Sequence, residues 1–236
     1  LFARQPVKPI KRLINKDIKG KKVLITGGGG SIGSEIVRKS IICNPEEIHI
    51  IEKSEFNLYQ IQKELSQCEI KIHYHLVDLK DFSALQSIFD IFDFDTVYHA
   101  AAYKHVPILE DNPIAAVKNN IFATKNLLDQ CIVSNVSKFV FISTDKAVRP
   151  TSFMGATKRF SEMMVYAYTR SKKINCASVR FGNVIGSSGS VLPLFKEQIL
   201  NGGPITITNK SVERFFMSIS EASELVLQAG AMAKDE

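Results

Sequence analysis

The segment Val23-Leu-Ile-Thr-Gly-Gly-Gly-Gly-Ser-Ile-Gly33 (VLITGGGGSIG) joins an apolar run to a glycine-rich loop, and a helical pattern follows it. Within the loop Gly27, Gly30 and Gly33 recur at every third position. Glycine permits a tight turn, and the free N–H groups at the start of a helix can receive a pyrophosphate. Because a strand and a helix flank the loop, the pattern predicts a dinucleotide-binding turn rather than a glycine-rich surface loop.

Short β-branched and apolar runs alternate with longer helical patterns along the whole chain. This alternation is typical of βαβ units and a parallel sheet, so we predict an α/β fold with a Rossmann-type doubly wound parallel sheet. The expected strands are Val23–Thr26, Ile48–Ile51, Ile70–Val77, Thr96–Ala100, Phe139–Ser143 and Ala177–Phe181. The expected helices are Ser31–Cys43, Glu55–Gln67, Phe82–Phe89, Pro113–Ser134, Gly155–Arg170, Leu192–Leu200 and Ser220–Ala231.

The composition indicates a globular protein, because 236 residues with 45% hydrophobic content can bury a substantial core. The formal charge is +6, but 24 acidic residues are interspersed among 30 basic ones, and only Lys8–Lys22 is locally basic. We interpret that tract as a solvated linker, with a segment near an anionic membrane leaflet as the alternative. No aromatic-basic interleaving accompanies it, so nucleic-acid binding is not expected.

The chain is expected to have three parts. Residues 1–20 form a linker after an upstream, membrane-anchoring region, since the chain begins at Leu1 and not at methionine. Residues 21–181 form the NAD(P)-binding domain. Glycines between Gly182 and Gly189 and the Asn201–Pro204 segment interrupt the strand–helix rhythm, so residues 182–236 are expected to form a small substrate-binding region.

The four cysteines show neither Cys-x-x-Cys spacing nor paired His ligands, so no metal site and no disulfide framework are predicted. A reducing cytoplasm therefore suits the chain, on the inner face of the membrane if the parent protein is anchored. No apolar run reaches the about 18 residues that a membrane helix needs, and no signal-peptide pattern is present. This chain is thus expected to be soluble.

The ends of the next strands carry candidate cofactor ligands. Glu52 lies about twenty residues beyond the glycines, where a carboxylate can accept hydrogen bonds from a ribose, which favours NAD. The adjacent Lys53 and Ser54 leave NADP open as the alternative. Asp78 can contact the adenine or instead cap the following helix. The predicted cofactor-binding set is Gly27, Gly30, Ser31, Ile32, Gly33, Glu52, Asp78, Leu79, Ala100, Ala101 and Lys158.

The segment Ser143–Lys158 (STDKAVRPTSFMGATK) resembles the catalytic segment Tyr-x-x-x-Lys of nucleotide-dependent oxidoreductases, but Met154 occupies the tyrosine position. A thioether cannot hold or pass a proton. Proton chemistry is therefore expected from Asp145-Lys146, which follows an apolar strand where ligands of open α/β sheets bind. An exposed turn with a surface ion pair is the alternative. A second match, Tyr168-x-x-x-Lys172, lies roughly 20 Å further along the same helix and is assigned to structure or solvent.

Several motifs together resemble the nucleotide-sugar 4,6-dehydratases of bacterial polysaccharide and glycan biosynthesis, which are extended short-chain dehydrogenase/reductases. The methionine form is similar to the larger, membrane-anchored members that act on UDP-N-acetylglucosamine, and Leu1–Val7 resembles the linker after their membrane part. Relative to the family, the C-terminal region is expected to be incomplete. The motifs are Thr-Gly-x-x-Gly-x-x-Gly from Thr26, His99–Val106, Asp111–Pro113, Asn119-Asn120, STDKAV, Met154–Lys158 and Arg180–Val184.

The resemblance implies a lyase: hydride leaves C4 of the sugar for NAD+, water is lost from C5–C6, and hydride returns to C6. It implies that Lys158 clamps the cofactor, Thr144 (or its neighbour Ser143) contacts the C4 oxygen, and Lys146, with a depressed pKa, is the C5 base. Asp145 is the implied acid for the C6 hydroxyl, with a raised pKa. We hypothesise that Asp145 also takes the C4 hydroxyl proton, which removes the need for a tyrosine at Met154.

The resemblance also implies a UDP-sugar partner, and pairing through the helices Pro113–Ser134 and Gly155–Arg170 would make a homo-oligomer. For Arg180 a structural ion pair is the alternative, and for Lys104 a solvated surface position. Two other functions stay open: a nucleotide-sugar 4-epimerase and a catalytically silent cofactor-binding module. The implied substrate-binding residues are Lys104, Thr144, Arg180, Asn183 and Arg214.

Overall fold

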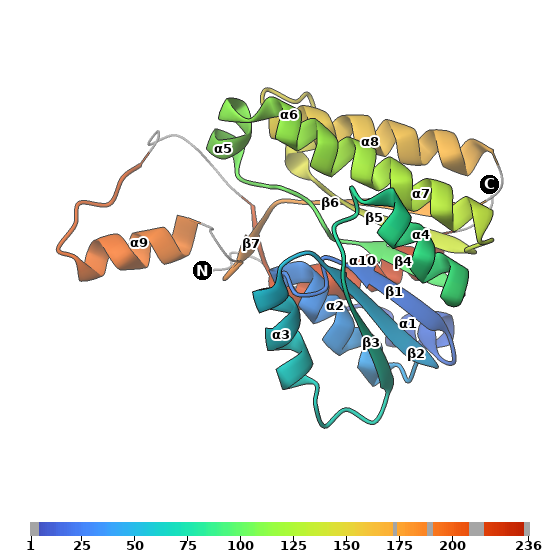
Figure 1. The fold of residues 1–236 in the computed structure, drawn as a ribbon. Helices are drawn as coiled ribbons and strands as arrows, with labels where there is room; N and C mark the ends of the chain where they lie inside the picture. The colour runs from blue at the N-terminus through green and yellow to red at the C-terminus, as the bar shows by residue number, and fades with distance from the viewer. Residues whose placement is uncertain (1–4, 172–173, 188–190, 208–214, 234–236) are drawn as a thin grey trace.

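A six-stranded parallel sheet forms the centre of the molecule (Figure 1). The structure, a computed structural model, describes residues 5–171, 174–187, 191–207 and 215–233. The strand order β3-β2-β1-β4-β5-β6 is that of the doubly wound Rossmann fold, which confirms the predicted fold class. The strands are β1 (Lys22–Thr26), β2 (Glu47–Glu52), β3 (Lys71–Leu76), β4 (Thr96–His99), β5 (Lys138–Thr144) and β6 (Asn175–Phe181).

Helices cover both faces of this sheet, as Figure 1 shows. On one face, Leu127 and Val165 pack with Phe139 and Phe141 of β5 in one buried cluster. On the other face, Ile36 and Val226 pack with strand residues in a second cluster. The first face carries α4 (Phe82–Ile91), α7 (Ala123–Val133) and α8 (Phe153–Arg170); the second carries α1 (Lys11–Ile18), α2 (Ser31–Ile42), α3 (Glu55–Glu64) and α10 (Ile219–Met232).

Side-chain caps fix where several helices begin. The Ser54 side chain accepts a hydrogen bond from the backbone of Asn57 at α3, and the Ser152 side chain accepts one from Gly155 at α8. Helix α4 is capped by Asp81. Asp78 is therefore not the cap of that helix, because the chain makes one further turn before α4 begins.

The basic N-terminal tract is not a solvated linker, because α1 forms within it. Ile14 and Ile18 are 4% and 1% exposed, and both belong to the cluster that contains α10 residues. The backbone N–H of Ile10 also donates to the side chain of Gln228 in α10. Two apolar residues four positions apart share one face of a helix, and the lysines around them lie on the outer faces.

The region after β6 forms structure of its own. It contains β7 (Asn183–Ile185) and β8 (Phe216–Ser218), which pair in parallel as a separate small sheet, and α9 (Val191–Leu200), which extends away from the body (Figure 1). Helix α10, within the residues assigned to the substrate-binding region, packs against α1, α2 and the main sheet, and it also contacts β7 and β8.

One expected helix, Pro113–Ser134, is divided in the structure. It consists of α6 (Pro113–Ala116), a π-helical segment (Val117–Phe122) and α7. A further short helix, α5 (Val106–Asp111), precedes it. Single-turn π segments often occur at functional sites, and this one contains Asn119-Asn120.

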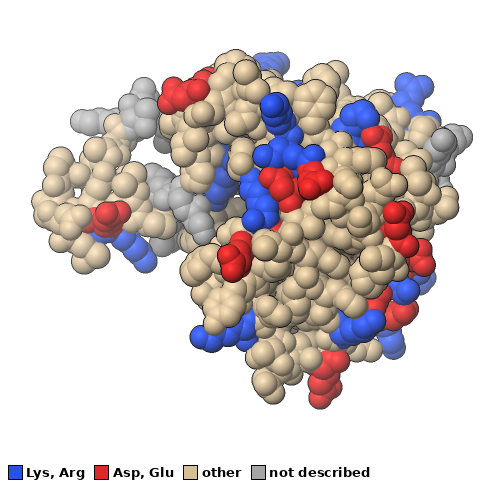
Figure 2. Space-filling view, viewed as in Figure 1, with Lys and Arg blue, Asp and Glu red and all other residues tan. Residues whose placement is uncertain are grey.

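On the face drawn in Figure 2, basic and acidic side chains are interspersed. Several basic side chains lie close together near the centre of that face, with acidic side chains directly beside them (Figure 2). Within the described part of the chain, no helix has both the length and the apolar character needed to cross a membrane.

Candidate active site

The turn between β1 and α2 forms a tightly packed cradle. Gly27 has φ +66°, and a Cβ atom there would lie 2.7 Å from the backbone nitrogen of Ala101. A Cβ atom on Gly33 would lie 2.0 Å from the carbonyl oxygen of Gly27. Side chains at either position are excluded, so the backbone of the turn stays close to the end of β4 and to the start of α2. These are the close approaches that a dinucleotide fingerprint requires.

A pocket of about 240 Å³ lies beside this turn, at the carboxyl ends of β1, β2, β3 and β4. It brings together seven of the residues that we predicted to bind the cofactor: Gly27, Gly30, Glu52, Asp78, Leu79, Ala100 and Ala101. Ser31 and Ile32 lie at the start of α2 behind the turn, beside Gly33. The pocket also contains residues not in that set: Ile51, Lys53, Ser54, Asn57, Val77, Ala102, Asn119 and Ala123.

Glu52 is held rigidly at the end of β2. Its side chain accepts hydrogen bonds from the backbone N–H groups of Gly29 (3.2 Å) and Ser54 (3.0 Å), and the residue is 8% exposed. Lys53 also lines the pocket, and its Nζ donates to Asn119 (2.9 Å) and lies 3.7 Å from the centre of the Tyr103 ring. The Glu52 carboxylate is thus held in place at the edge of the pocket, and the Lys53 ammonium already contacts Asn119 and Tyr103.

The π-helical segment holds the loop after β4 through Asn120. Its Oδ1 accepts from the backbone of Tyr103 (2.9 Å), and its Nδ2 donates to the Tyr103 carbonyl (3.0 Å) and to Thr157 of α8 (3.1 Å). One buried amide therefore ties the β4 loop to the helix that carries Met154 and Lys158. The sequence offered Asn120 only as part of a motif, since its partners lie far away along the chain.

His99 is a buried connector between β1 and α7. Its Nδ1 lies 2.6 Å from Oγ1 of Thr26 and its Nε2 lies 2.8 Å from Oγ1 of Thr124. Because the Thr124 hydroxyl donates to a backbone carbonyl, we assign the imidazole proton to Nε2. Burial, with the nearby Lys158 ammonium, lowers the pKa of His99 to about 3. The ring is therefore neutral at physiological pH.

The predicted acid/base residues lie together where β5 ends. Thr144 donates from Oγ1 to Oδ1 of Asp145 (3.0 Å), and Nζ of Lys146 donates to the same oxygen (3.0 Å). Lys146 Nζ also donates to Oδ1 of Asn183 in β7 (3.3 Å). Asp145 and Lys146 keep side-chain exposures of 44% and 37%, so both can reach a ligand. Asn183, predicted to bind substrate, thus belongs to the same group.

The electrostatics of Asp145 differ from those implied for a resting proton donor. Burial alone would raise its pKa, but the hydrogen bonds from Lys146 and Thr144 and the Lys146 charge outweigh burial, and the net pKa is lowered. Asp145 is therefore an ionised acceptor in this state. The expectation of a raised pKa is wrong here because the carboxylate has a cationic partner within hydrogen-bond distance.

Met154 and Lys158 lie one turn apart on α8, and both are buried. Met154 is 4% exposed and packs with Leu109 and Ala116 in a small apolar cluster. Lys158 is 7% exposed, and its Nζ donates to the carbonyl oxygen of Ile142 in β5 (2.9 Å). Burial lowers the pKa of Lys158 to about 8, although the Glu162 carboxylate partly offsets this effect. Lys158 is thus not an exposed surface lysine.

The turn with Asp145 and Lys146 lies directly against the start of α8. A Cβ atom on Gly155 would be 2.3 Å from the carbonyl oxygen of Lys146, so only glycine allows this approach. Ser143, in contrast, turns away: its hydroxyl donates to Glu162 (2.6 Å). Of the two hydroxyls considered for the C4 oxygen, Thr144 is therefore the one beside the acid/base pair.

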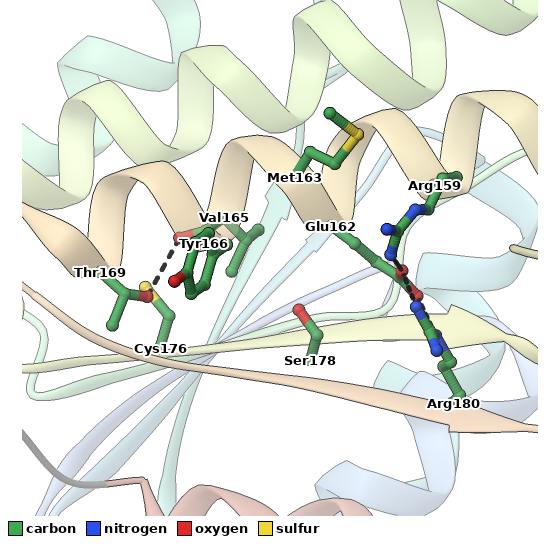
Figure 3. A pocket seen from close by; sticks show the side chains of 9 residues that line it. All are labelled: Arg159, Glu162, Met163, Val165, Tyr166, Thr169, Cys176, Ser178 and Arg180. Carbon is green, nitrogen blue, oxygen red and sulfur yellow. Dashed lines mark hydrogen bonds and ion pairs between the residues drawn. The ribbon is translucent and has the colours of Figure 1, made fainter. Parts of the chain in front are cut away.

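Arg180 forms the structural ion pair that the sequence left as an alternative. Its guanidinium donates to both carboxylate oxygens of Glu162, at 2.7 and 2.5 Å, and Arg159 reaches the same carboxylate (3.3 Å). Figure 3 shows these three side chains converging in a groove of about 490 Å³ between α8 and β6. Neither Asp145 nor Lys146 lines this groove.

Two predicted substrate-binding residues, Lys104 and Arg214, and the second Tyr-x-x-x-Lys match remain to be placed. Lys104 is exposed in the loop after β4. Arg214 lies outside the described residues. Tyr168 of the second Tyr-x-x-x-Lys match donates its hydroxyl to Asp129, which supports the structural assignment for that residue.

The chain resembles proteins of polysaccharide biosynthesis. It is 46% identical over 237 residues to the probable polysaccharide biosynthesis protein EpsC of Bacillus subtilis, with 99% of this chain and 40% of the relative covered. The capsular polysaccharide biosynthesis protein CapD of Staphylococcus aureus is 46% identical over 238 residues, with the same shares covered. The chain thus spans about two fifths of the length of these curated relatives.

Other relatives carry other names. The UDP-glucose 4-epimerase of Rickettsia canadensis is 36% identical over 217 residues, which cover 89% of this chain and 62% of that protein. Among solved structures, Pen from Bacillus thuringiensis has a TM-score of 0.87 at 38% identity and covers 92% of this chain and 67% of that chain. The family described as polysaccharide biosynthesis protein matches residues 23–236. The chain therefore belongs to the polysaccharide biosynthesis protein family and has the fold of the extended short-chain dehydrogenase/reductases.

Proposed function

We propose that the protein is a nucleotide-sugar 4,6-dehydratase that converts UDP-N-acetylglucosamine to its 4-keto-6-deoxy product with a bound nicotinamide cofactor. The observation that carries this proposal is the Thr144–Asp145–Lys146 group at the end of β5, in which a hydroxyl and an ammonium share one carboxylate oxygen at 3.0 Å. A dehydration across C5–C6 needs both an acid and a base beside the sugar. Asp145 and Lys146 supply this pair of groups.

The residues of the cradle fit a nicotinamide dinucleotide. Without Cβ atoms, Gly27 and Gly33 let the turn pack closely against the first turn of α2. The N–H groups in the first turn of a helix have no partner within that helix, and a pyrophosphate can be held there. When bound, the cofactor supplies the hydride acceptor at C4 and the hydride donor at C6. Glu52 would bind the ribose hydroxyls and disfavour a 2′-phosphate, and Lys53 is engaged by Asn119, so NAD is the proposed form.

The side chains of the group can balance the protons of the reaction. Oxidation at C4 releases the hydroxyl proton, and ionised Asp145 accepts it through the Thr144 hydroxyl. The Lys146 ammonium first releases one proton to solvent, and its neutral amine then removes the C5 proton. Asp145 delivers its proton to the departing C6 hydroxyl, which leaves as water. Lys146 finally returns a proton to C5 and takes one proton back from solvent. Each side chain ends in its starting state, and the product differs from the substrate by one water.

This scheme explains why a methionine is tolerated in place of tyrosine. Met154 is buried against Leu109 and Ala116 and contributes no proton-carrying group. The proton relay passes instead through Thr144 and Asp145, which are already hydrogen-bonded. Lys158 keeps a depressed pKa and a single backbone partner in the hydrogen bonds described, Ile142, so its remaining N–H groups suit a ribose hydroxyl.

The test compares three proteins with UDP-N-acetylglucosamine and NAD, with the nucleotide sugar analysed by mass spectrometry. The wild type is expected to form a product that has lost one water. Asp145→Asn is expected to lose activity by roughly 10²-fold or more, the usual contribution of a general acid or base. Asp93→Asn, an exposed residue away from the group, is the control and should keep full turnover. An Asp145→Asn protein with wild-type activity would refute the proposed relay.

A UDP-sugar 4-epimerase is the second candidate, because relatives at 36% identity carry that name. An epimerase shares the cofactor cradle, but its reaction ends at C4 and makes no use of a group that removes the C5 proton. Its product has the same mass as the substrate. Formation of an equal-mass isomer without loss of water would therefore favour the epimerase.

A further inference from the structure

A second cluster of reactive side chains lies at the amino ends of β2 and β3, away from the proposed active site. Glu47 and His49 alternate on β2, and His73 and His75 alternate on β3, so all four share one face of the sheet. The parallel register pairs His49 with His73. Glu47 and Glu52 lie at opposite ends of β2, about 16 Å apart at about 3.3 Å per residue.

Three potential ligand atoms converge in this cluster. Oε1 of Glu47 lies 3.2 Å from Nε2 of His49, and Oε2 of Glu47 lies 3.5 Å from Nε2 of His73. One ligand atom from each of the three residues can be chosen so that all lie within 4.8 Å of one another. Glu47 is 7% exposed, the His49 side chain is 0% exposed, and the His73 side chain is 24% exposed.

The two imidazole nitrogens that face Glu47 are buried without a hydrogen-bond partner among the described residues. Their approach to the carboxylate is close, but its geometry is not that of a hydrogen bond. Unpartnered buried polar atoms are uncommon in folded proteins, and an ion that the side chains surround is one explanation. Two such atoms beside one carboxylate form a coherent set of donors.

A third histidine orients the first. Nδ1 of His49 lies 3.0 Å from Nε2 of His75, a bond that fixes the ring and, with Nδ1 protonated, leaves the Nε2 lone pair directed toward Glu47. Metal-binding histidines usually donate their other ring nitrogen to such a partner.

We propose that Glu47, His49 and His73 bind one divalent transition-metal ion of the zinc class. Two imidazoles and one carboxylate are a ligand set that Zn²⁺ accepts, with a water in the fourth position. Bonds of about 2.0–2.1 Å place tetrahedral ligands about 3.4 Å apart. The 3.2 Å separation from His49 and the 3.5 Å separation from His73 are close to this value, and each involves a different oxygen of the Glu47 carboxylate.

Closure of the site needs two adjustments, one at His73 and one at Lys71. The rings of His49 and His73 are stacked with centroids 4.3 Å apart and planes 10° apart, so their lone pairs do not yet meet at one point. His73 is the more exposed ring and can turn. Lys71, which contacts Glu47 at 3.0 Å, has a 66% exposed side chain and can move into solvent when the ion neutralises the carboxylate.

The ion would join β2 to β3 and would lie about 16 Å of strand length from the Glu52 rim. It would not touch the sugar or the cofactor. Its effect would be to stabilise the edge of the sheet, because an ion that binds the folded state alone raises the unfolding temperature. The proposal is thus independent of the reaction proposed above.

The test titrates chelator-treated protein with Zn²⁺ by calorimetry and with Co²⁺ by visible absorption. We expect one ion per chain, a higher Tm with Zn²⁺, and a tetrahedral Co²⁺ spectrum without thiolate charge transfer. His73→Gln and Glu47→Gln should each weaken binding by at least about tenfold. His105→Gln, an exposed histidine outside the cluster, is the matched control and should bind normally.

Three outcomes would overturn the proposal. They are the absence of Zn²⁺ binding to the wild type, unchanged affinity in both His73→Gln and Glu47→Gln, and a Co²⁺ spectrum dominated by thiolate ligands. His49 is not chosen for substitution because its full burial links it to folding. His73→Gln changes a partly exposed residue, and circular dichroism checks that its fold is retained.

Discussion

Gly33→Ala should disrupt the cradle more than Gly30→Ala. Both residues are fingerprint glycines, and neither has the positive φ of Gly27, so the difference depends on the space around the new methyl group. In Gly33→Ala the new Cβ would lie 2.0 Å from the Gly27 carbonyl oxygen, and ordinary contact begins at 3.4 Å, so backbone must move by about 1.4 Å. The nearest atoms belong to backbone and cannot turn aside as a side chain can. Overpacking of this kind typically costs about 1–3 kcal/mol, and we expect a value at or above the upper end.

The assay for this prediction combines urea denaturation with calorimetric titration of NAD. Gly30→Ala is the matched control, since its Cβ would meet the same oxygen at 3.2 Å and requires a shift of only a few tenths of an ångström. Gly33→Ala should lose stability and NAD affinity together, and Gly30→Ala should lose clearly less of each. Wild-type stability and NAD affinity in Gly33→Ala would refute the reasoning.

Three further predictions concern the helix α8 and the buried histidine. Arg180→Met should destabilise the fold by about 1–2 kcal/mol in urea denaturation, because it leaves the 6% exposed Glu162 carboxylate with weaker partners; an unchanged midpoint would contradict the structural role. Met154→Tyr should lower stability by about 1–3 kcal/mol through overpacking while the dehydrated product still forms, and loss of that product would show that the position matters chemically. The pKa of His99 is about 3 in the folded protein and 6.5 ordinarily, so the unfolded chain takes up the proton first as pH falls. Up to about 5 kcal/mol of the free energy of unfolding should therefore be lost between pH 6.5 and pH 3. A free energy of unfolding that stays constant over that range would contradict the assigned neutral ring.

Much of the fold follows from local pattern. The central strands of the sheet are buried on both faces, so each reads as a continuous apolar run, and β1, β4 and β5 were predicted to within one residue at each end. Helix α1 was missed because its buried face consists of only Ile14 and Ile18 within a lysine-rich tract. The pairing of β7 with β8 was missed because three-residue strands have no periodicity of their own.

Part of the candidate site also follows from local sequence pattern, and the rest depends on how distant elements pack. Asp145 and Lys146 were predictable because they follow a strong strand, and the ends of parallel strands meet at one edge of the sheet. The pairing of Arg180 with Glu162 depends on how α8 crosses β6, which no local pattern contains. The histidine cluster depends on the register between β2 and β3, so the alternation in each strand gave no sign of a shared site.

The most direct test of the central claim is the fate of the C5 hydrogen when UDP-N-acetylglucosamine and NAD are incubated with the protein in D2O. The proposed chemistry has Lys146 remove that proton and return one that has exchanged with solvent. We therefore predict, by NMR and mass spectrometry, a product that has lost one water and carries deuterium at C5. A sugar that changes configuration at C4 with no loss of water and no deuterium at C5 would contradict the account.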